Sequence, residues 1–405
     1  MATKPTAVTV SESTRRYDID ALRVFAFGLL IIFHVGMFYV LDWGWHVKST
    51  YQFKWLQLPM TFTNQWRMSL LFLISGLAMS FVWGKYSTGQ FVLRRIWRLL
   101  VPLLFGMAFI VSAQCYYEAL NKGIIEPGYL VFMGQYLTFQ DFPGEAWAGE
   151  EQIHWTWNHL WYLPYLLIYT LLLVPVGKFI DGPGKAIRRR FQNLRGVWII
   201  LVPIVPTLIS YNLFVPQYAT FTRALIDDWY AHSIYCTAFL YGYLIGRDDG
   251  FWAELTRIRG VTLALAVVFF TLYFLQREHG FLGTSDWQFQ ARGLIEQLNA
   301  WLWITTVLGW GHYWLNKPMR WLPYATEAVY PWYILHQTII LVVGFNLSRL
   351  QLGPVVEPAL VLLATIAGCL LLHEFVIRRV TFLRPFFGLS VKAVKGSEPF
   401  SSKGL

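Results

Sequence analysis

Residues 17–39 read Tyr-Asp-Ile-Asp-Ala-Leu-Arg-Val-Phe-Ala-Phe-Gly-Leu-Leu-Ile-Ile-Phe-His-Val-Gly-Met-Phe-Tyr. From Leu22 the stretch is almost wholly apolar and long enough to cross a bilayer as a helix. Arg23 and His34 interrupt it, and their spacing places them about 20° apart on one helix face and roughly 16 Å apart along the axis. Ionisable groups inside a membrane are costly, so this stripe favours a functional site. The structural alternatives are that Arg23 marks the cytoplasmic end and that His34 is an interhelical hydrogen-bonding residue.

The composition indicates a polytopic membrane protein. Of 405 residues, 56% are hydrophobic, 18% aromatic and only 14% charged, whereas a soluble domain carries about 25% charged residues. A net charge of +10 would suggest a nucleic-acid partner in a soluble protein. Here the basic residues mostly flank apolar spans, so membrane topology explains them and we expect no nucleic-acid partner. The three cysteines and the scattered histidines form neither a disulfide framework nor a metal-binding spacing, so no metal is expected.

Hydropathy predicts an all-α integral membrane helical bundle with about ten transmembrane helices. The expected spans cover residues 21–41, 62–82, 96–118, 159–180, 197–215, 229–246, 260–275, 294–315, 325–347 and 355–377. The seventh span is short, and the sixth contains many polar residues. In this interpretation residues 1–20 form an N-terminal tail, residues 21–377 the transmembrane domain and residues 378–405 a C-terminal tail.

The segments that connect the spans alternate in basic charge. The N-terminal segment and every second segment after it together contain 25 of the 33 Lys and Arg residues. The segments between them contain seven Lys and Arg residues. Loops rich in Lys and Arg face the cytoplasm. The bias therefore places both termini in the cytoplasm and puts Arg67, at the opening of the second span, near the outer surface.

A basic motif, Arg94-Arg95-Ile96-Trp97-Arg98, opens the third span. Arg95 and Arg98 are three residues apart and share a helix face, and the arginine fork matches the geometry of a phosphate. Arg23 is expected on the same side of the membrane, so a ligand with several phosphates would fit between the two groups. Simple anchoring at the membrane edge is the alternative.

Other polar residues mark the later spans. Ser75-Gly76 permits close approach of another helix or of a thin ligand, and helix packing is the simpler interpretation. His336 lies eleven residues into the ninth span, at a depth similar to that of His34. Glu374, near the end of the tenth span, is expected to pair with a basic residue. The outer loop 119–158 is acidic and rich in tryptophan, which suits either sugar binding or a membrane-interface belt.

These motifs resemble the signature of the type 3 membrane acyltransferase family. Arg23, followed by ten residues and His34, resembles its first-helix motif, and Arg95-Ile-Trp-Arg98 resembles its Arg-x-x-Arg motif. The resemblance extends over nearly the whole chain and includes members that succinylate osmoregulated periplasmic glucans. It rests further on Asp20-Ala-Leu-Arg23, Trp45-His46, Arg67-Met68, Phe72-Leu-Ile-Ser-Gly76, His159-Leu-Trp-Tyr162, Tyr333-Ile-Leu-His336 and Glu374.

The resemblance implies a cytoplasmic acyl-CoA donor, either succinyl-CoA or acetyl-CoA, and an acceptor hydroxyl on a glycan, in particular a glucan. It implies a multi-pass protein of the bacterial inner membrane, with the lipid bilayer around it and proteins of glucan synthesis as partners. Arg23, Arg95 and Arg98 would hold the phosphates of coenzyme A. His34 would act as the general base that takes the proton of the acceptor hydroxyl.

The remaining assignments concern the substrates. Arg67 or His336 would steady the oxyanion or the free carboxylate of a succinyl group. Asp20 would bias the region from the cytoplasmic side, and Trp161, within a matching stretch, is assigned to substrate binding. The alternative function is a proton-coupled transporter or flippase of a glycan or lipid intermediate, which buried His and Arg residues also suit. The sequence shows no repeat pair or matched Gly/Pro-broken helices to support that alternative.

Overall fold

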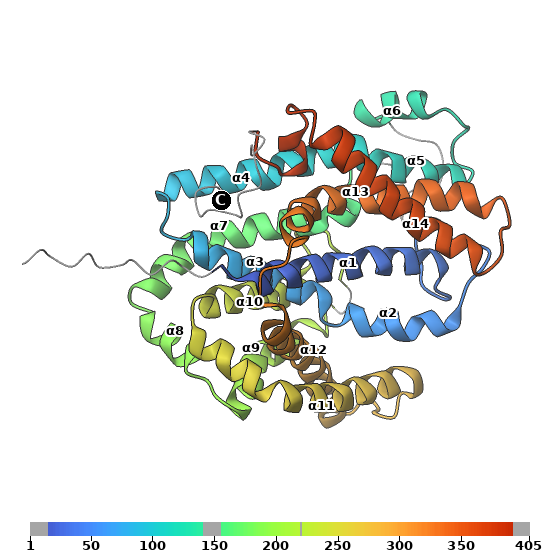
Figure 1. Cartoon of the computed structure of the whole chain (residues 1–405). Helices are drawn as coiled ribbons and strands as arrows, with labels where there is room; N and C mark the ends of the chain where they lie inside the picture. The colour runs from blue at the N-terminus through green and yellow to red at the C-terminus, as the bar shows by residue number, and fades with distance from the viewer. Residues whose placement is uncertain (1–14, 141–154, 219–220, 392–405) are drawn as a thin grey trace, which may run out of the picture.

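The computed structural model describes residues 15–140, 155–218 and 221–391, and in these ranges the chain is built of helices (Figure 1). Pairing of the β type there is confined to an isolated bridge between Val40 and Phe53. Eight helical segments in the described ranges are long and apolar enough to span a membrane. The prediction of an all-α, multi-pass membrane bundle is therefore confirmed.

The main helices follow one another along the whole chain. They are α1 Tyr17–Tyr39, α2 Gln57–Asn64, α3 Arg67–Val82, α4 Thr88–Phe105, α5 Ser112–Asn121, α6 Tyr129–Leu137, α7 Tyr162–Asp181, α8 Lys185–Gln192, α9 Val197–Phe214, α10 Trp229–Ile245, α11 Asp249–His279, α12 Asp286–Leu315, α13 Leu322–Ser348 and α14 Val356–Leu371. Shorter helical segments are Lys54–Leu56, Asn158–Trp161 and Arg384–Phe387, and π-helical segments are Gly106–Val111 and Leu372–Ile377.

Each expected span overlaps one of these helices. The sixth and eighth spans correspond to α10 and α12, which are not among the eight segments that meet both the length and the hydropathy expected of a span. α10 has only 17 residues, and α12 carries charged residues in its first half. The count of ten spans and the cytoplasmic position of both termini stay predictions.

Two helices differ in extent from the expected spans. The seventh span, expected to be short, is the 31-residue helix α11. Its early turns carry charged residues that break the hydropathy pattern, but Glu254 and Arg257 pair within the helix at 2.6 Å and the helix continues. The second span is divided, because Gln65 and Trp66 separate α2 from α3.

α3 and α10 pack together backbone to backbone. A Cβ atom at Gly76 would lie 1.8 Å from the carbonyl oxygen of Phe239, and one at Gly242 would lie 1.9 Å from that of Leu73. Only glycine fits either position without moving a helix. The helix-packing interpretation of Ser75-Gly76 is thus the one the structure supports, and it fixes α3 firmly in the bundle.

α1 runs through the middle of the molecule, with α13 and α14 on one side and α12 on the other (Figure 1). One face of α1 buries Leu22, Ala26 and Leu30 against these neighbours. Another face exposes Phe25 and Ile32, as expected where a helix meets lipid. The Arg–His stripe of α1 is therefore carried by a helix with one face inside the bundle.

Candidate functional site

His34 on α1 and His336 on α13 form a hydrogen-bonded pair. Nδ1 of His34 lies 2.8 Å from Nε2 of His336. Nδ1 of His336 lies 3.0 Å from the carbonyl oxygen of Trp332 and 2.8 Å from that of Tyr333. The expectation that the two histidines share a depth is confirmed. His336 is fully buried, whereas His34 is half-buried, so His34 is the ring that a substrate can reach.

The loop 40–53 folds back beside His34. Lys48 donates hydrogen bonds to three backbone carbonyl oxygens at and just beyond the C-terminal end of α1, which satisfies groups that a helix end leaves open. Burial lowers the pKa of this lysine. The loop thereby holds the Trp45 ring parallel to the His34 ring, at an angle of 8° and with 6.5 Å between centroids.

A polar network continues from the histidine pair into neighbouring elements. Nδ1 of His46 faces the carboxylate of Glu118, and Nε2 of His46 lies 3.1 Å from the side-chain oxygen of Asn158. Gln337, the next residue along α13, donates to Asn158 at 3.3 Å and to Gln114 at 3.0 Å. Nδ2 of Asn158 is buried and has no hydrogen-bond partner in the described ranges. The network can therefore offer amide hydrogens to a polar group of a ligand.

An apolar groove between α1 and α13 reaches His336, the member of the histidine pair that lines it. Its volume is about 180 Å³. A Cβ atom built on Gly28 would meet no described atom within 4 Å, so the groove is open beside this glycine. The lining residues are Val24, Phe27, Gly28, Leu30 and Ile31 of α1, and Tyr324, Ala325, Ala328, Val329, Trp332, Tyr333 and His336 of α13. The groove thus begins at the residue after Arg23 and follows α1 inward.

Arg67, at the start of α3, is only 2% exposed. Its guanidinium carbon lies 4.0 Å from the centroid of the Phe33 ring, and that ring lies edge-on to His34 with 5.7 Å between centroids. Among the described residues, nothing accepts a hydrogen bond from Nε or Nη1 of Arg67. Buried guanidinium nitrogens without a hydrogen-bond acceptor are costly. This geometry indicates a place for an anionic group one aromatic ring away from His34.

The arginines predicted to bind phosphate gather at the other end of the groove. Arg98 interacts electrostatically with both Arg95 and Arg23. The hydroxyl of Tyr330 donates to the backbone carbonyl of Arg98 at 3.0 Å, which joins α4 to the helix that lines the groove. Asp20 lies 3.8 Å from Arg23. Asp20 is therefore part of the arginine end and lies at the far end of α1 from His34.

The other predicted residues lie farther out. Trp161 belongs to an aromatic cluster, with its ring centroid 5.6 Å from that of Tyr235 on α10. Tyr235 in turn interacts electrostatically with Arg67, so this cluster borders the Arg67 side of the site. Glu374 pairs with Arg378 at 2.8 Å, as expected.

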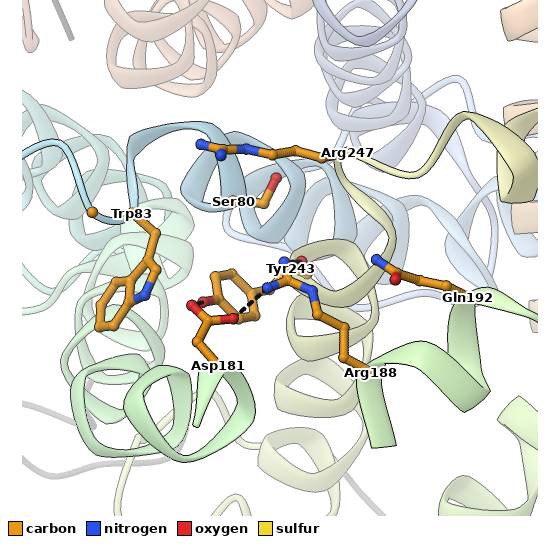
Figure 2. Close-up of a pocket in the computed structure, with 8 residues that line it drawn as sticks. Ser80, Trp83, Asp181, Arg188, Gln192, Tyr243 and Arg247 are labelled. Carbon is orange, nitrogen blue, oxygen red and sulfur yellow. Dashed lines mark hydrogen bonds and ion pairs between the residues drawn. The ribbon is translucent and has the colours of Figure 1, made fainter. Parts of the chain in front are cut away.

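A larger cavity of about 320 Å³ lies at the ends of α3, α7, α8 and α10 (Figure 2). Figure 2 shows the Asp181 carboxylate beside Arg188 and Tyr243; it accepts hydrogen bonds from the Arg188 guanidinium and, at 3.0 Å, from the Tyr243 hydroxyl. Trp83, which also lines the cavity, is one phenylalanine ring away from Arg95. The cavity thus adjoins the arginine end but is not lined by any of the predicted site residues.

The network around His46 was not predicted as a unit. A usable signal was present, because Gln114 and Gln337 are uncharged polar residues inside apolar spans, where a side-chain amide needs a partner. Several residues of the acidic outer loop lie outside the described residues: Asp141, Glu145, Trp147, Glu150 and Glu151. In residues 15–140, 155–218 and 221–391, no group of three His, Cys, Asp or Glu side chains is placed to hold a metal ion.

Comparisons with known proteins agree with one another. Residues 16–374 match the family model of the acyltransferase 3 type, described as an acyltransferase domain. Glucans biosynthesis protein C of Escherichia coli (strain K12) is 25% identical over 342 residues, which cover 82% of this chain and 83% of the relative. The protein of the same name from Shigella dysenteriae serotype 1 (strain Sd197) matches to the same extent. No solved structure matches.

Proposed function

The chain belongs to the acyltransferase 3 family, and from that premise we propose that it moves an acyl group from cytoplasmic acyl-CoA to a hydroxyl of a periplasmic glucan, across the bacterial inner membrane. The observation that carries this proposal is the apolar groove that runs from the arginine end of α1 to the His34–His336 pair. His336 is the histidine that lines the groove, and His34 is its hydrogen-bond partner.

The groove suits the shape of coenzyme A. This donor has phosphates at one end and a thioester at the other, joined by a thin arm. Arg23, Arg95 and Arg98 would hold the phosphates through charge-assisted hydrogen bonds, and the arm would lie beside Gly28. The separation of roughly 16 Å between Arg23 and His34 along the helix is of the order of the length of that arm.

Neutral His34 would act as the general base. It takes the proton of the acceptor hydroxyl while the hydroxyl oxygen forms a bond to the thioester carbonyl carbon. The tetrahedral intermediate then collapses, the carbon–sulfur bond breaks and the new ester leaves. The protonated His34 gives its proton to the leaving thiolate of coenzyme A, so the ring ends the cycle neutral.

Arg67 favours a succinyl over an acetyl group. A succinyl group ends in a carboxylate, which matches the two guanidinium nitrogens of Arg67 that have no partner in the described part of the chain. The four-carbon chain would pass the Phe33 ring, which separates Arg67 from His34. An acetyl group would leave the buried charge unpaired.

A glucan acceptor is supported by two observations. The relatives are named for glucan biosynthesis, and the network of His46, Asn158 and Gln337 presents hydrogen-bonding groups of the kind that sugar hydroxyls use. The buried amide of Asn158 would donate to the acceptor. Proteins of glucan synthesis are the partners we propose for its supply.

The test is release of coenzyme A by the purified protein, with succinyl-CoA and acetyl-CoA side by side and a periplasmic-type glucan as acceptor. We expect glucan-dependent release from succinyl-CoA. The variant His34→Ala should lower kcat by at least about 100-fold and leave donor binding unchanged. The control for loss of an imidazole is His373→Ala, because His373 is buried and lies outside the groove lining.

Two outcomes would count against the proposal. If His34→Ala keeps its activity, His34 is not the base. If folded wild-type protein neither binds a CoA ester nor releases coenzyme A, acyl transfer is wrong and transport of a glycan or lipid intermediate becomes the better explanation of the buried ionisable residues.

A further inference from the structure

The hydrogen bonds of His336 determine which of its nitrogens carries hydrogen. Nδ1 faces two backbone carbonyl oxygens, of Trp332 at 3.0 Å and of Tyr333 at 2.8 Å. A carbonyl oxygen only accepts hydrogen bonds, so Nδ1 must be the donor. A neutral imidazole has one N–H, and therefore Nε2 of His336 holds a lone pair.

That lone pair points at His34. Nε2 of His336 lies 2.8 Å from Nδ1 of His34, and a hydrogen bond between them requires His34 to donate. The single hydrogen of neutral His34 is then on Nδ1, and its lone pair is on Nε2. We propose that His336 is a positioning residue that holds His34 in the tautomer whose Nε2 accepts the proton of the acceptor hydroxyl. The inference rests on the proposed function, in which His34 is the base.

The surroundings hold the His336 ring in this orientation. The His159 ring meets it edge-on, with 5.3 Å between centroids and an angle of 83°. His159 is itself fixed: Nε2 donates to the carbonyl oxygen of Ile334 at 3.1 Å, and the amide of Gln114 donates to Nδ1 at 3.1 Å. A flip of the His336 ring would break both of its contacts with carbonyl oxygens. The backbone of α13 therefore determines the direction of the hydrogen bond between His34 and His336.

The tautomer matters because only one nitrogen of His34 can receive a proton. Neutral imidazole in water favours hydrogen on Nε2, which is the wrong form for a base that uses that atom. The buried acceptor on α13 reverses the preference. In serine proteases, loss of the group that holds the histidine tautomer lowers kcat by about 10⁴, so the effect expected here is large.

The first arm of the test is nitrogen-15 NMR of the full-length wild-type protein in lipid bilayers, with labelled histidine and the His34 signals identified by their loss in His34→Ala. At a pH where His34 is neutral, we expect Nδ1 protonated and Nε2 unprotonated. The reverse pattern would overturn the inference without the need for any variant of His336.

The second arm compares two substitutions of the same residue. His336→Leu removes the acceptor, whereas His336→Gln offers a side-chain oxygen near the same position. In His336→Leu we expect the His34 hydrogen to move to Nε2, kcat to fall at least about 100-fold, and KM for the donor to stay within about twofold. In His336→Gln we expect the Nδ1–H form and a substantial part of kcat to return. His373→Leu serves as the control for loss of a buried imidazole.

The outcomes separate the inference from the proposed function. If His34→Ala is inactive but His336→Leu keeps both kcat and the Nδ1–H form, only the role of His336 is wrong. If His34→Ala is active, the proposed base is wrong whatever His336 does. If His336→Leu does not fold, the wild-type spectrum and His336→Gln still decide the question.

Discussion

His336, which accepts a hydrogen bond from His34 in our inference, itself donates to peptide carbonyl oxygens of its own helix. In serine proteases the group that accepts from Nδ1 of the base is a buried aspartate, and here it is His336. A neutral histidine held by carbonyl oxygens adds no net charge. This choice suits a site that, in our proposal, must accept both a developing oxyanion and the carboxylate of a succinyl group, since a fixed negative charge beside His34 would repel them.

At Arg67 we expect one substitution to separate the two donors. Arg67→Met keeps most of the side-chain length but removes the charge. Loss of one partner of a buried charge pair costs at least about 2 kcal/mol, so kcat/KM for succinyl-CoA should fall at least about 30-fold, whereas acetyl-CoA turnover should not fall. The measurement is donor-dependent release of coenzyme A.

The matched control for that experiment is Arg349→Met. The guanidinium of Arg349 also lies over a phenylalanine ring, at 4.3 Å from the centroid of Phe345, but its side chain is exposed. It should behave as wild type with both donors. An equal fall in kcat/KM for both donors in Arg67→Met would show that Arg67 does not distinguish the two acyl groups.

Two helix pairs pack in different ways: α3 and α10 pack tightly, whereas α1 and α13 leave a groove between them. α3 and α10 touch backbone to backbone at Gly76 and Gly242, which holds Arg67 at the start of α3 in a fixed position. α1 and α13 touch at the histidine pair but leave the groove beside Gly28. The first pair holds a charged side chain in place, and the second leaves a groove that reaches His336.

The groove gives a prediction about α1. Gly28→Leu should fit the helix, because no described atom lies within 4 Å of the new Cβ and leucine favours helix by about 1 kcal/mol over glycine. The side chain would nevertheless fill the path. We expect KM for the donor to rise at least about tenfold while the melting temperature stays the same or rises.

Gly260→Leu is the control for the groove. Gly260 also lies inside a helix, α11, and a Cβ atom at this position would likewise meet no described atom within 4 Å, but it is remote from the groove lining. It should leave KM unchanged. Normal donor kinetics in Gly28→Leu would mean that the donor arm takes another path.

At the scale of the whole molecule, the proposal needs the arginine end in the cytoplasm and the His46 network toward the periplasm. Lys85, between α3 and α4, and Glu126, between α5 and α6, are both exposed and mark these two sides. In intact cells, a maleimide that does not cross membranes should label Glu126→Cys and not Lys85→Cys. The native cysteines are buried or half-buried. Labelling of position 85 alone would show that the topology is the reverse of the one proposed.

The parts of the fold that were predictable are local ones. α1 and its Arg–His stripe follow from one continuous segment, and the depth of His336 follows from counting residues within one span. The length of α11 was not predictable from hydropathy, since Glu254 and Arg257 neutralise each other only once the helix has formed.

Candidate site residues that belong to one sequence motif could be predicted from the sequence. Contacts between segments far apart in the sequence could not. His46 and Gln337 are 291 residues apart in the sequence and contact each other only through the fold. That Nε and Nη1 of Arg67 find no acceptor among the described residues is also a tertiary property, because a sequence shows that an arginine is present but not which acceptors reach it. The direction of the His34–His336 hydrogen bond depends on the backbone of α13.

The hydrogen bond between His34 and His336 joins residues 302 positions apart. With translation at about 5–20 residues per second, roughly 15–60 s pass between synthesis of the first histidine and synthesis of the second. Throughout that interval the nascent chain holds His34 but not His336, which in our proposal orients it. In that proposal the growing polypeptide lacks full activity toward its donor until the penultimate long helix has been made, so a prematurely terminated chain is a poor thioesterase.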